Sequence, residues 1–313
     1  MTSRGLSPGF LRLAFSIIAL SAAPERRVSG ADLAPITDEQ KAKVTAALPT
    51  AADATKPARP RRVLIFYRTE GYVHASIPVG NFALAEMGRV TGAYDAELSN
   101  DMAAFTPDAL TRFDGVLFNS TTKLAFADPA QRAALMDFIE KRGGGLMGIH
   151  AATDNFYDFP DACAALGGQF DGHPWHWDHN CAVKLDEPDH PANAAFGGHG
   201  FWITDEIYQI GGPYSRETHR VLLSLDMSKP ENLNVEGIKR TDGDFPISWF
   251  KHAGMGRVFY CSLGHNDHVY WNPAVLKHYL AGIQYALGDR DLPDAPSASL
   301  MHKPEPALAP AKP

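Results

Sequence analysis

Short apolar runs alternate with amphipathic stretches through residues 61–288, which we expect to form one folded domain. Residues 62–67 are rich in β-branched and aromatic side chains, which is typical of a buried strand. A helix is predicted from Ser76 to Gly92, because apolar positions recur along one face between them. Further strands are predicted at residues 94–98, 113–119 and 145–149. This order predicts right-handed crossovers and an α/β fold with a doubly wound, mainly parallel sheet.

The carboxyl ends of parallel strands are where a doubly wound sheet binds its ligands. The predicted topology places three loops along that edge, at residues 69–76, 119–122 and 150–154. Functional side chains are therefore expected in these loops.

The second half of the domain changes character. Glycine- and proline-rich turns join runs that predict strands at residues 201–210, 221–225, 245–250 and 256–263. This spacing is typical of an antiparallel extension of the sheet, which a final amphipathic helix at residues 273–287 would close.

The two ends of the chain lie outside this domain. Residues 1–30 combine Arg4 and Arg12 with a short apolar stretch and small residues, which predicts a signal peptide and a periplasmic or secreted protein; a misassigned start or an amphipathic leader is the alternative. Residues 31–60 predict a short helix with Thr37 as N-cap and then a Pro/Ala linker that buries nothing. Residues 289–313 predict a disordered tail.

Composition narrows the partners. The formal net charge is −7 and the basic residues are scattered, which argues against nucleic acid as a partner. No apolar run after the amino terminus reaches the roughly 20 residues of a membrane span. The three cysteines, Cys163, Cys181 and Cys261, lack the spacing of a zinc site and allow at most one disulfide. A small-molecule partner is expected, and a homo-oligomer is compatible with the sequence.

His150 occupies the most telling position. It directly follows a predicted strand and precedes a helix-like stretch, so it is expected at a sharp nucleophile-elbow turn that projects its side chain into solvent. Asp154, four residues on, is predicted to hold the ring and fix its tautomer. The alternative is a structural histidine packed under a loop.

Two other histidines follow predicted strands. His74 lies in the loop after the first strand, and His265 follows the strand at residues 256–263. The topology would bring both to the edge that carries His150. Chance is the alternative, because 13 histidines are spread along the chain.

Residues 171–179 form the densest cluster of polar and aromatic side chains, with histidines at 173, 176 and 179. The run suits a metal site or a surface on which sugar rings stack against tryptophan. Asp205 and Glu206 lie in a predicted strand, where alternation sends them to opposite faces, so only one can face the site. An acid–base pair would then need a partner such as Asp154 or Asp267.

Several spaced motifs make the chain resemble the ThuA-like (trehalose utilisation) family over residues 61–288. They are the stretches at residues 62–66, 69–77, 148–154, 172–174, 189–191, 205–208, 246–249, 256–260 and 263–265. The resemblance implies a flavodoxin-like, glutamine-amidotransferase-like fold and a role in carbohydrate catabolism. Class I glutamine amidotransferases have a cysteine at the elbow where this chain has His150, so amide hydrolysis by a thiolate is disfavoured.

The polar residues of these motifs and their neighbours are expected to have the following roles. The expected catalytic residues are His150 or His265 as general base, Asp154 to orient it, and Glu206 with Tyr208 for proton transfer. The residues expected to bind substrate are His74, Ser76, His173, Trp175 and His190. A divalent metal is a possible cofactor, with His150, His173 and His265 as candidate ligands.

The leading hypothesis is an enzyme, hydrolase or lyase, that cleaves or transforms a glycoside or 3-keto-sugar by histidine acid–base chemistry. The alternative is a non-catalytic sugar-binding protein on the same scaffold. A third hypothesis is an amidotransferase-like hydrolase that uses Cys261. It is disfavoured, because that cysteine lies inside a predicted strand and not at an elbow.

Overall fold

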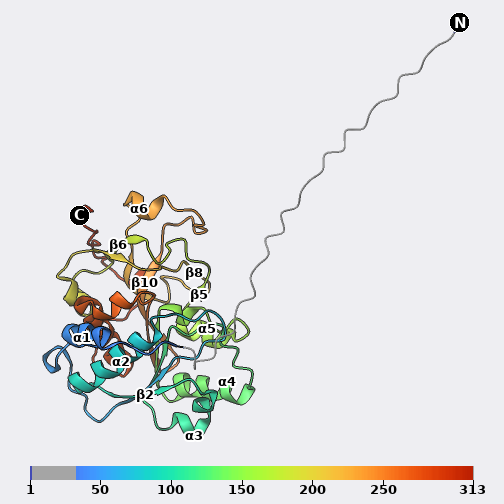
Figure 1. Ribbon diagram of the computed structural model, residues 1–313, viewed down its shortest axis with the longest axis vertical. Coiled ribbons are helices and arrows are strands. Elements are labelled where there is room, and N and C mark those ends of the chain that lie inside the picture. Colours follow the sequence, from blue (N-terminus) through green and yellow to red (C-terminus); the bar gives the residue numbers. More distant parts are fainter. Residues whose placement is uncertain (2–32, 313) are drawn as a thin grey trace.

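A nine-stranded sheet forms the centre of the molecule, with its strands in the order β2-β1-β3-β4-β11-β10-β9-β6-β7. The computed structural model describes Met1 and residues 33–312 (Figure 1). The predicted signal peptide, residues 1–30, lies outside the described residues except for Met1. Among the helices of the described part, every one is too short or too polar to cross a lipid bilayer.

The first half of the sheet is parallel. Its strands are β2 (Asp95–Ser99), β1 (Arg62–Phe66), β3 (Gly115–Asn119), β4 (Gly145–Ile149) and β11 (Gly256–Cys261). The order β2-β1-β3-β4-β11 is that of a flavodoxin-like fold, with β11 in the fifth position. The predicted doubly wound α/β architecture is confirmed.

The second half of the sheet is antiparallel, as predicted. It consists of β10 (Pro246–Ala253), β9 (Arg220–Leu225), β6 (Asn180–Leu185) and β7 (Phe201–Thr204). The strand predicted at residues 201–210 is divided, since β7 ends at Thr204 and β8 (Ile210–Gly211) pairs with β5 (Gln169–Phe170) in a separate small sheet. The Asp205 carboxylate turns the chain away, because it accepts hydrogen bonds from the amides of Gly264 and Asn266 at 2.7 and 2.9 Å.

Helices cover both faces of the sheet (Figure 1). One core packs α1 (Asp38–Ala47), α2 (Ile77–Thr91) and α7 (Pro273–Ala286) against the sheet. The other packs α3 (Pro107–Leu110), α4 (Pro129–Met136) and α5 (Pro160–Leu166), and α6 (Pro230–Leu233) lies beside β6. A π-helical turn, Asp137–Lys141, extends α4. Single 3₁₀ turns are η2 (Ala51–Asp53), η3 (Met102–Phe105), η5 (His150–Thr153), η6 (Pro191–Phe196), η7 (Asp267–Trp271) and η8 (Ser297–Ser299).

The segment before the domain is better packed than the sequence suggests. Thr37 caps α1 as predicted, in a reciprocal capping box with Gln40. The Pro/Ala linker does not stay clear of the domain, because Pro49 is buried and Thr55 exchanges two hydrogen bonds with Gln284 of α7. The prediction that this linker buries nothing is therefore wrong.

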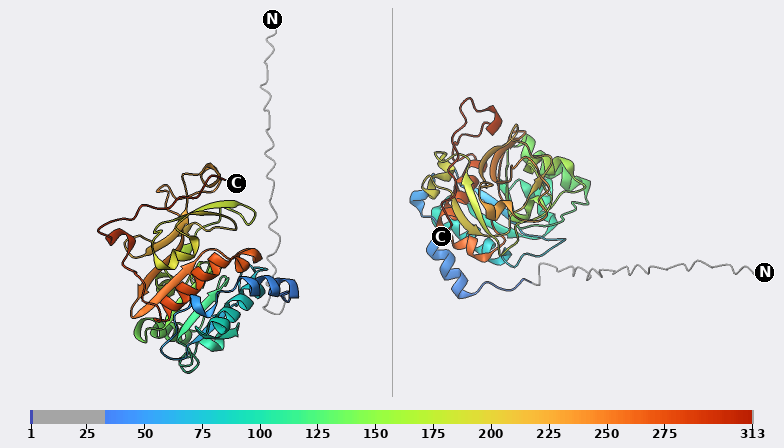
Figure 2. Two further views of the ribbon diagram at one scale, coloured as in Figure 1. Left: turned by 90° about the vertical axis from the view of Figure 1, so that its left-hand side faces the viewer. Right: turned by 90° about the horizontal axis from the view of Figure 1, so that it is seen from above.

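The carboxyl-terminal segment also packs, where a disordered tail was expected. Figure 2 shows it running beside the antiparallel strands. Leu185 and Ala307 exchange two backbone hydrogen bonds, and Ser297 bonds the backbone of His219 and Val221. Leu292 is buried. Proline blocks helix formation here but leaves these extended contacts available.

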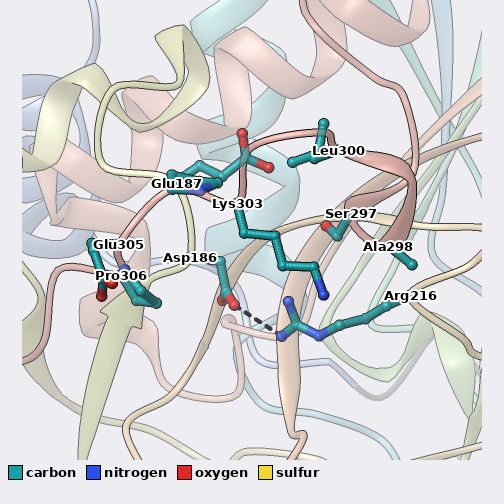
Figure 3. Close-up of a pocket in the computed structure, with 10 residues that line it drawn as sticks. Asp186, Glu187, Arg216, Ser297, Ala298, Leu300, Lys303, Glu305 and Pro306 are labelled. Atoms are coloured by element: carbon teal, nitrogen blue, oxygen red, sulfur yellow. Dashed lines mark ion pairs between the residues drawn. The ribbon is translucent and has the colours of Figure 1, made fainter.

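The tail also covers a cavity of about 300 Å³ at the corner after β6 (Figure 3). Arg216 pairs there with Asp186 at 2.8 Å, and Lys303 extends from the tail into the same space. Glu187 pairs with Arg220 beside it. Because Asp186 and Glu187 already have basic partners and the tail itself forms one wall, this cavity lies where the tail docks.

Close packing of α7 on β11 gives a first prediction. A Cβ added at Gly282 would lie 2.4 Å from the Phe259 ring, so G282A should lower the free energy of unfolding by about 1–3 kcal/mol through overpacking. Urea unfolding measures the change. The F259L background should reduce it, whereas a stabilised G282A, as helix propensity alone would give, would contradict the packing argument.

The buried His278 predicts acid sensitivity. It bonds Ser248 and the Ala192 carbonyl, and burial lowers its pKa from 6.5 to about 4. The unfolded chain therefore takes up a proton below about pH 6.5 while the folded chain does so only near pH 4, so stability is lost as pH falls through that window. His278 should account for about 2 kcal/mol of the loss between pH 7 and 5. In H278Q the dependence measured by urea unfolding should be flatter by that amount; an unchanged slope would contradict this.

Candidate active site

Four side chains converge at the carboxyl ends of the parallel strands. One potential ligand atom from each of His74, His150, Glu206 and His265 lies within 4.8 Å of the others. They come from the loop after β1, the turn after β4, the segment after β7 and the loop after β11. The strand-end loops predicted to share an edge therefore do bring His74, His150 and His265 together.

His150 stands at a strained elbow. Its φ is +50°, in the left-handed region that residues other than glycine rarely adopt, directly after β4. Its side chain is fully buried rather than projecting into solvent, because His74, Tyr208 and His265 pack around it. In the loop after β11, Gly264 has φ of +134° and a Cβ there would lie 2.8 Å from the Tyr270 hydroxyl, so the chain that packs against His150 requires a glycine.

The tautomer of His150 is set by the backbone and not by Asp154. Nδ1 donates to the Ser262 carbonyl at 2.8 Å, which leaves the Nε2 lone pair facing His74 Nε2 at 3.1 Å. Asp154 instead bonds Lys123 and Tyr157. The sequence analysis chose the wrong partner because residues 151–153 form a 3₁₀ turn that carries Asp154 past the ring.

Glu206 is the carboxylate that faces the histidines. Its Oε1 lies 3.7 Å from His150 Nε2 and 3.2 Å from His265 Nδ1, and its Oε2 lies 3.3 Å from His173 Nδ1. Asp205 points away to the amides after β11. As expected, only one of the two neighbouring carboxylates belongs to the site.

Burial controls the charge of the cluster. It lowers the pKa of His74 to about 3 and the pKa of His150 well below the usual 6.5, with help from the neighbouring imidazoles. Burial would also lower the pKa of His265, but the contact and charge of Glu206 outweigh it and raise that pKa. His74 and His150 are therefore neutral near pH 7, as metal-binding imidazoles must be.

The cluster leaves polar atoms unsatisfied. The Nδ1 atoms of His74 and His265 are buried without a well-directed hydrogen bond among the described residues. Buried polar groups are normally paired, so unpaired ones need an explanation such as an ion. Three imidazoles and a carboxylate at this spacing fit the ligand set of a divalent transition metal.

A cleft of about 460 Å³ opens beside the cluster. Its walls include Tyr208 and His173, together with His176 and Trp177 from the Trp-rich run. The pKa of Tyr208 is raised well above 10, chiefly by burial, so its hydroxyl keeps its proton. A cleft of this size is in the range of small-molecule sites.

Three residues predicted to bind substrate lie elsewhere. Trp175 is fully buried against Phe245, because the chain alternates and sends Trp177 to the cleft instead. His190 caps η6 and bonds the Pro293 carbonyl. Ser76 is buried and donates to the Gly264 carbonyl at 2.9 Å, so it positions the loop of His265 rather than touching the cleft.

Backbone strain is concentrated beside the site. Within the described residues, the positive-φ positions other than glycine are Ser120, Lys123, Phe126, His150 and Phe156. All of them lie in the loops after β3 and β4. Such strain persists only where the surrounding structure enforces it, and it clusters at functional sites.

Sequence reasoning did not single out Tyr72 or Lys123, which both line the cleft. Both follow parallel strands and lie in or next to loops that the topology placed at this edge, which was the available signal. Cys261 is excluded as a nucleophile, because it lies in β11 and burial raises its pKa to about 12.

The ThuA pattern, described as trehalose utilisation, matches residues 62–286. A putative ThuA-like protein from Bacteroides uniformis is 24% identical, with a TM-score of 0.58 over 74% of this chain and 94% of its own. A second from Parabacteroides merdae is 17% identical, with a TM-score of 0.55 over 74% and 91%. No protein with a curated description matches. The chain therefore belongs to the ThuA trehalose utilisation family.

Proposed function

We propose that the protein is an enzyme that transforms a glycoside or keto-sugar in the cleft, with a divalent cation held by His74, His150, Glu206 and His265. The observation that carries the proposal is the convergence of these four side chains within 4.8 Å at the strand ends. Family membership supports a carbohydrate as substrate.

The ligand set favours a divalent transition metal such as Zn²⁺, Fe²⁺ or Mn²⁺ over Ca²⁺, since nitrogen donors predominate. The bond from His150 Nδ1 to the Ser262 carbonyl is the kind of outer contact that orients a ligating imidazole. A cation held there would supply Lewis acidity toward a substrate carbonyl or hydroxyl. On this view His150 is a ligand and not the general base first expected.

His173 is the best placed general base. Its Nδ1 is buried 3.3 Å from Glu206 Oε2, yet the side chain as a whole is 41% exposed. The exposed edge of the ring is therefore the one that carries Nε2, and the carboxylate favours a proton on Nδ1. Nε2 is then free to accept a proton from a substrate in the cleft.

This arrangement suits a 3-keto glycoside. The keto group acidifies the C–H bond at C2, and His173 Nε2 would take that proton as an enolate forms. The enolate electrons then expel the aglycone from C1, and the protonated imidazole returns the proton to the departing oxygen. Tyr208, which keeps its hydroxyl proton, can donate a hydrogen bond to a substrate oxygen.

Metal binding tests the cluster. The wild type should bind Zn²⁺ or Mn²⁺ with a stoichiometry near one, and H74A and E206Q should weaken binding at least about 100-fold because each removes a ligand. Isothermal titration calorimetry measures both. H199Q, which removes an exposed histidine outside the cleft, is the matched control. Equal affinity in E206Q and H199Q would rule out the proposed ligand set.

Turnover tests the base. Trehalose, other disaccharides and their 3-keto derivatives are incubated with the metal-loaded protein, and released monosaccharide is measured by mass spectrometry. H173Q should lower kcat about 100- to 10,000-fold while it retains the metal, because the base is lost and the ligands stay. Tight binding of a sugar without turnover under every metal condition would favour the non-catalytic binder instead.

A further inference from the structure

A second polar group lines the same cleft. Lys123 donates to Asp154 Oδ1 at 2.9 Å, and the Tyr157 hydroxyl donates to the same oxygen. Within the described chain, no hydrogen bond or ion pair joins this group to the four cluster residues. Resting on the function proposed above, we propose that Lys123 and Asp154 are a specificity-determining pair that binds two neighbouring hydroxyls of a substrate sugar ring.

Lys123 is held unusually firmly for a lysine at a cleft wall. Its stem packs on the turn at Gly71, where an added Cβ would lie 2.4 Å from the Lys123 Cγ. Its ammonium lies 4.0 Å from the centre of the Tyr157 ring. A lysine in solvent normally keeps its rotamer freedom, so ordering this one costs side-chain entropy before any ligand binds. A ligand that needs the ammonium in this place would then lose less entropy on binding.

The backbone at this lysine is strained. Lys123 has φ of +55°, and its amide donates to the Asp154 carbonyl at 2.7 Å, which joins the loops after β3 and β4. Buried Asn155 links the same loops, because its side chain bonds Thr121 and the amide of Leu124. The lysine and the aspartate are therefore fixed relative to each other before any ligand arrives.

The hydrogen-bonding positions that the pair leaves unused match two neighbouring hydroxyls. Asp154 Oδ1 accepts both bonds, whereas Oδ2 accepts none from the described residues and is open to a hydroxyl donor. The ammonium keeps two N–H donors for a hydroxyl oxygen. Because the two charges compensate each other, the pair suits a neutral polyol better than a phosphate.

The ammonium is not set up for imine chemistry. Burial would lower the pKa of Lys123, but Tyr157 and Asp154 outweigh it and raise that pKa. The amine therefore keeps its proton, and a binding role fits better than attack on a keto group.

Exposed aromatic rings complete the subsite. The exposed aromatic side chains of the described residues are Tyr72, Tyr157 and Trp177. Tyr72 and Trp177 line the cleft, and Tyr157 lies under Lys123 beside it. Aromatic faces beside paired donors and acceptors are what a sugar ring needs, with its C–H face stacked and its hydroxyls bonded.

Calorimetry on the metal-loaded protein tests the pair. The probes are trehalose, 3-ketotrehalose and a set of monodeoxy trehaloses. We expect K123M and D154N to bind trehalose at least about 10-fold more weakly than wild type, since each loses a charge-assisted hydrogen bond. One deoxy analogue should bind wild type about 10-fold more weakly than trehalose does, whereas K123M should bind the two alike. K141M, which removes another lysine paired with an aspartate, is the control.

Each outcome separates the two proposals. If the wild type binds none of the sugars, both the proposed function and the pair are overturned. If it binds them and K123M and D154N bind equally well, only the pair is overturned. Loss of bound metal in K123M would mean a structural role for the lysine and would also overturn the pair. D154N, whose side chain has nearly the same shape as aspartate, is the second variant in case K123M fails to fold.

Discussion

The parallel pairing of β4 with β11 is the contact on which the site depends. Cys261 lies opposite Ile149 in this ladder, so the residues that follow each strand emerge side by side. His150 and Ser262 are 112 residues apart in sequence and are joined by the bond between the ring and the carbonyl. The hydroxyl of Tyr260, in β11, donates a hydrogen bond to the His150 carbonyl at 2.7 Å. Without this pairing the elbow would have neither a fixed tautomer nor His265 beside it.

The same pairing explains the antiparallel part. The chain between β4 and β11 must leave the sheet and return to its fifth position, and it does so by building β6, β7, β9 and β10 on the far side. On the way back it sends Glu206 over the strand ends, because Asp205 is anchored by the loop after β11. The site is thus assembled from both halves of one sheet.

Much of the fold could be predicted from local pattern. Buried strands such as β1 and the capped helix α2 carry their signal in consecutive residues. Strand β6 was missed because Pro and His residues surround it. Strand β7 was extended too far because alternation alone does not reveal the hydrogen bond that the Gly264 amide donates to the Asp205 carboxylate. Both failures come from long-range contacts that override a local pattern.

The candidate site was predictable to the same degree. Strand ends located His74, His150 and His265, whose positions follow from topology. Side-chain direction was not predictable. Trp175 was expected at the substrate but is buried, and Trp177 lines the cleft instead. His190 was also expected at the substrate but caps η6. Lys123 escaped notice because its left-handed backbone and its packing on Gly71 appear only in three dimensions.

The carboxyl-terminal segment has a consequence for which backbone groups the sheet leaves open. A sheet whose last strand is open can template pairing with another chain. Here Ala307 pairs with the end of β6, and Pro310 accepts from Trp202 of the edge strand β7. Pro304, Pro306 and Pro310 have no amide hydrogen to pass the ladder on. The segment thus takes the backbone position beside β6 at Leu185 that another chain could otherwise pair with, and its prolines do not extend the ladder.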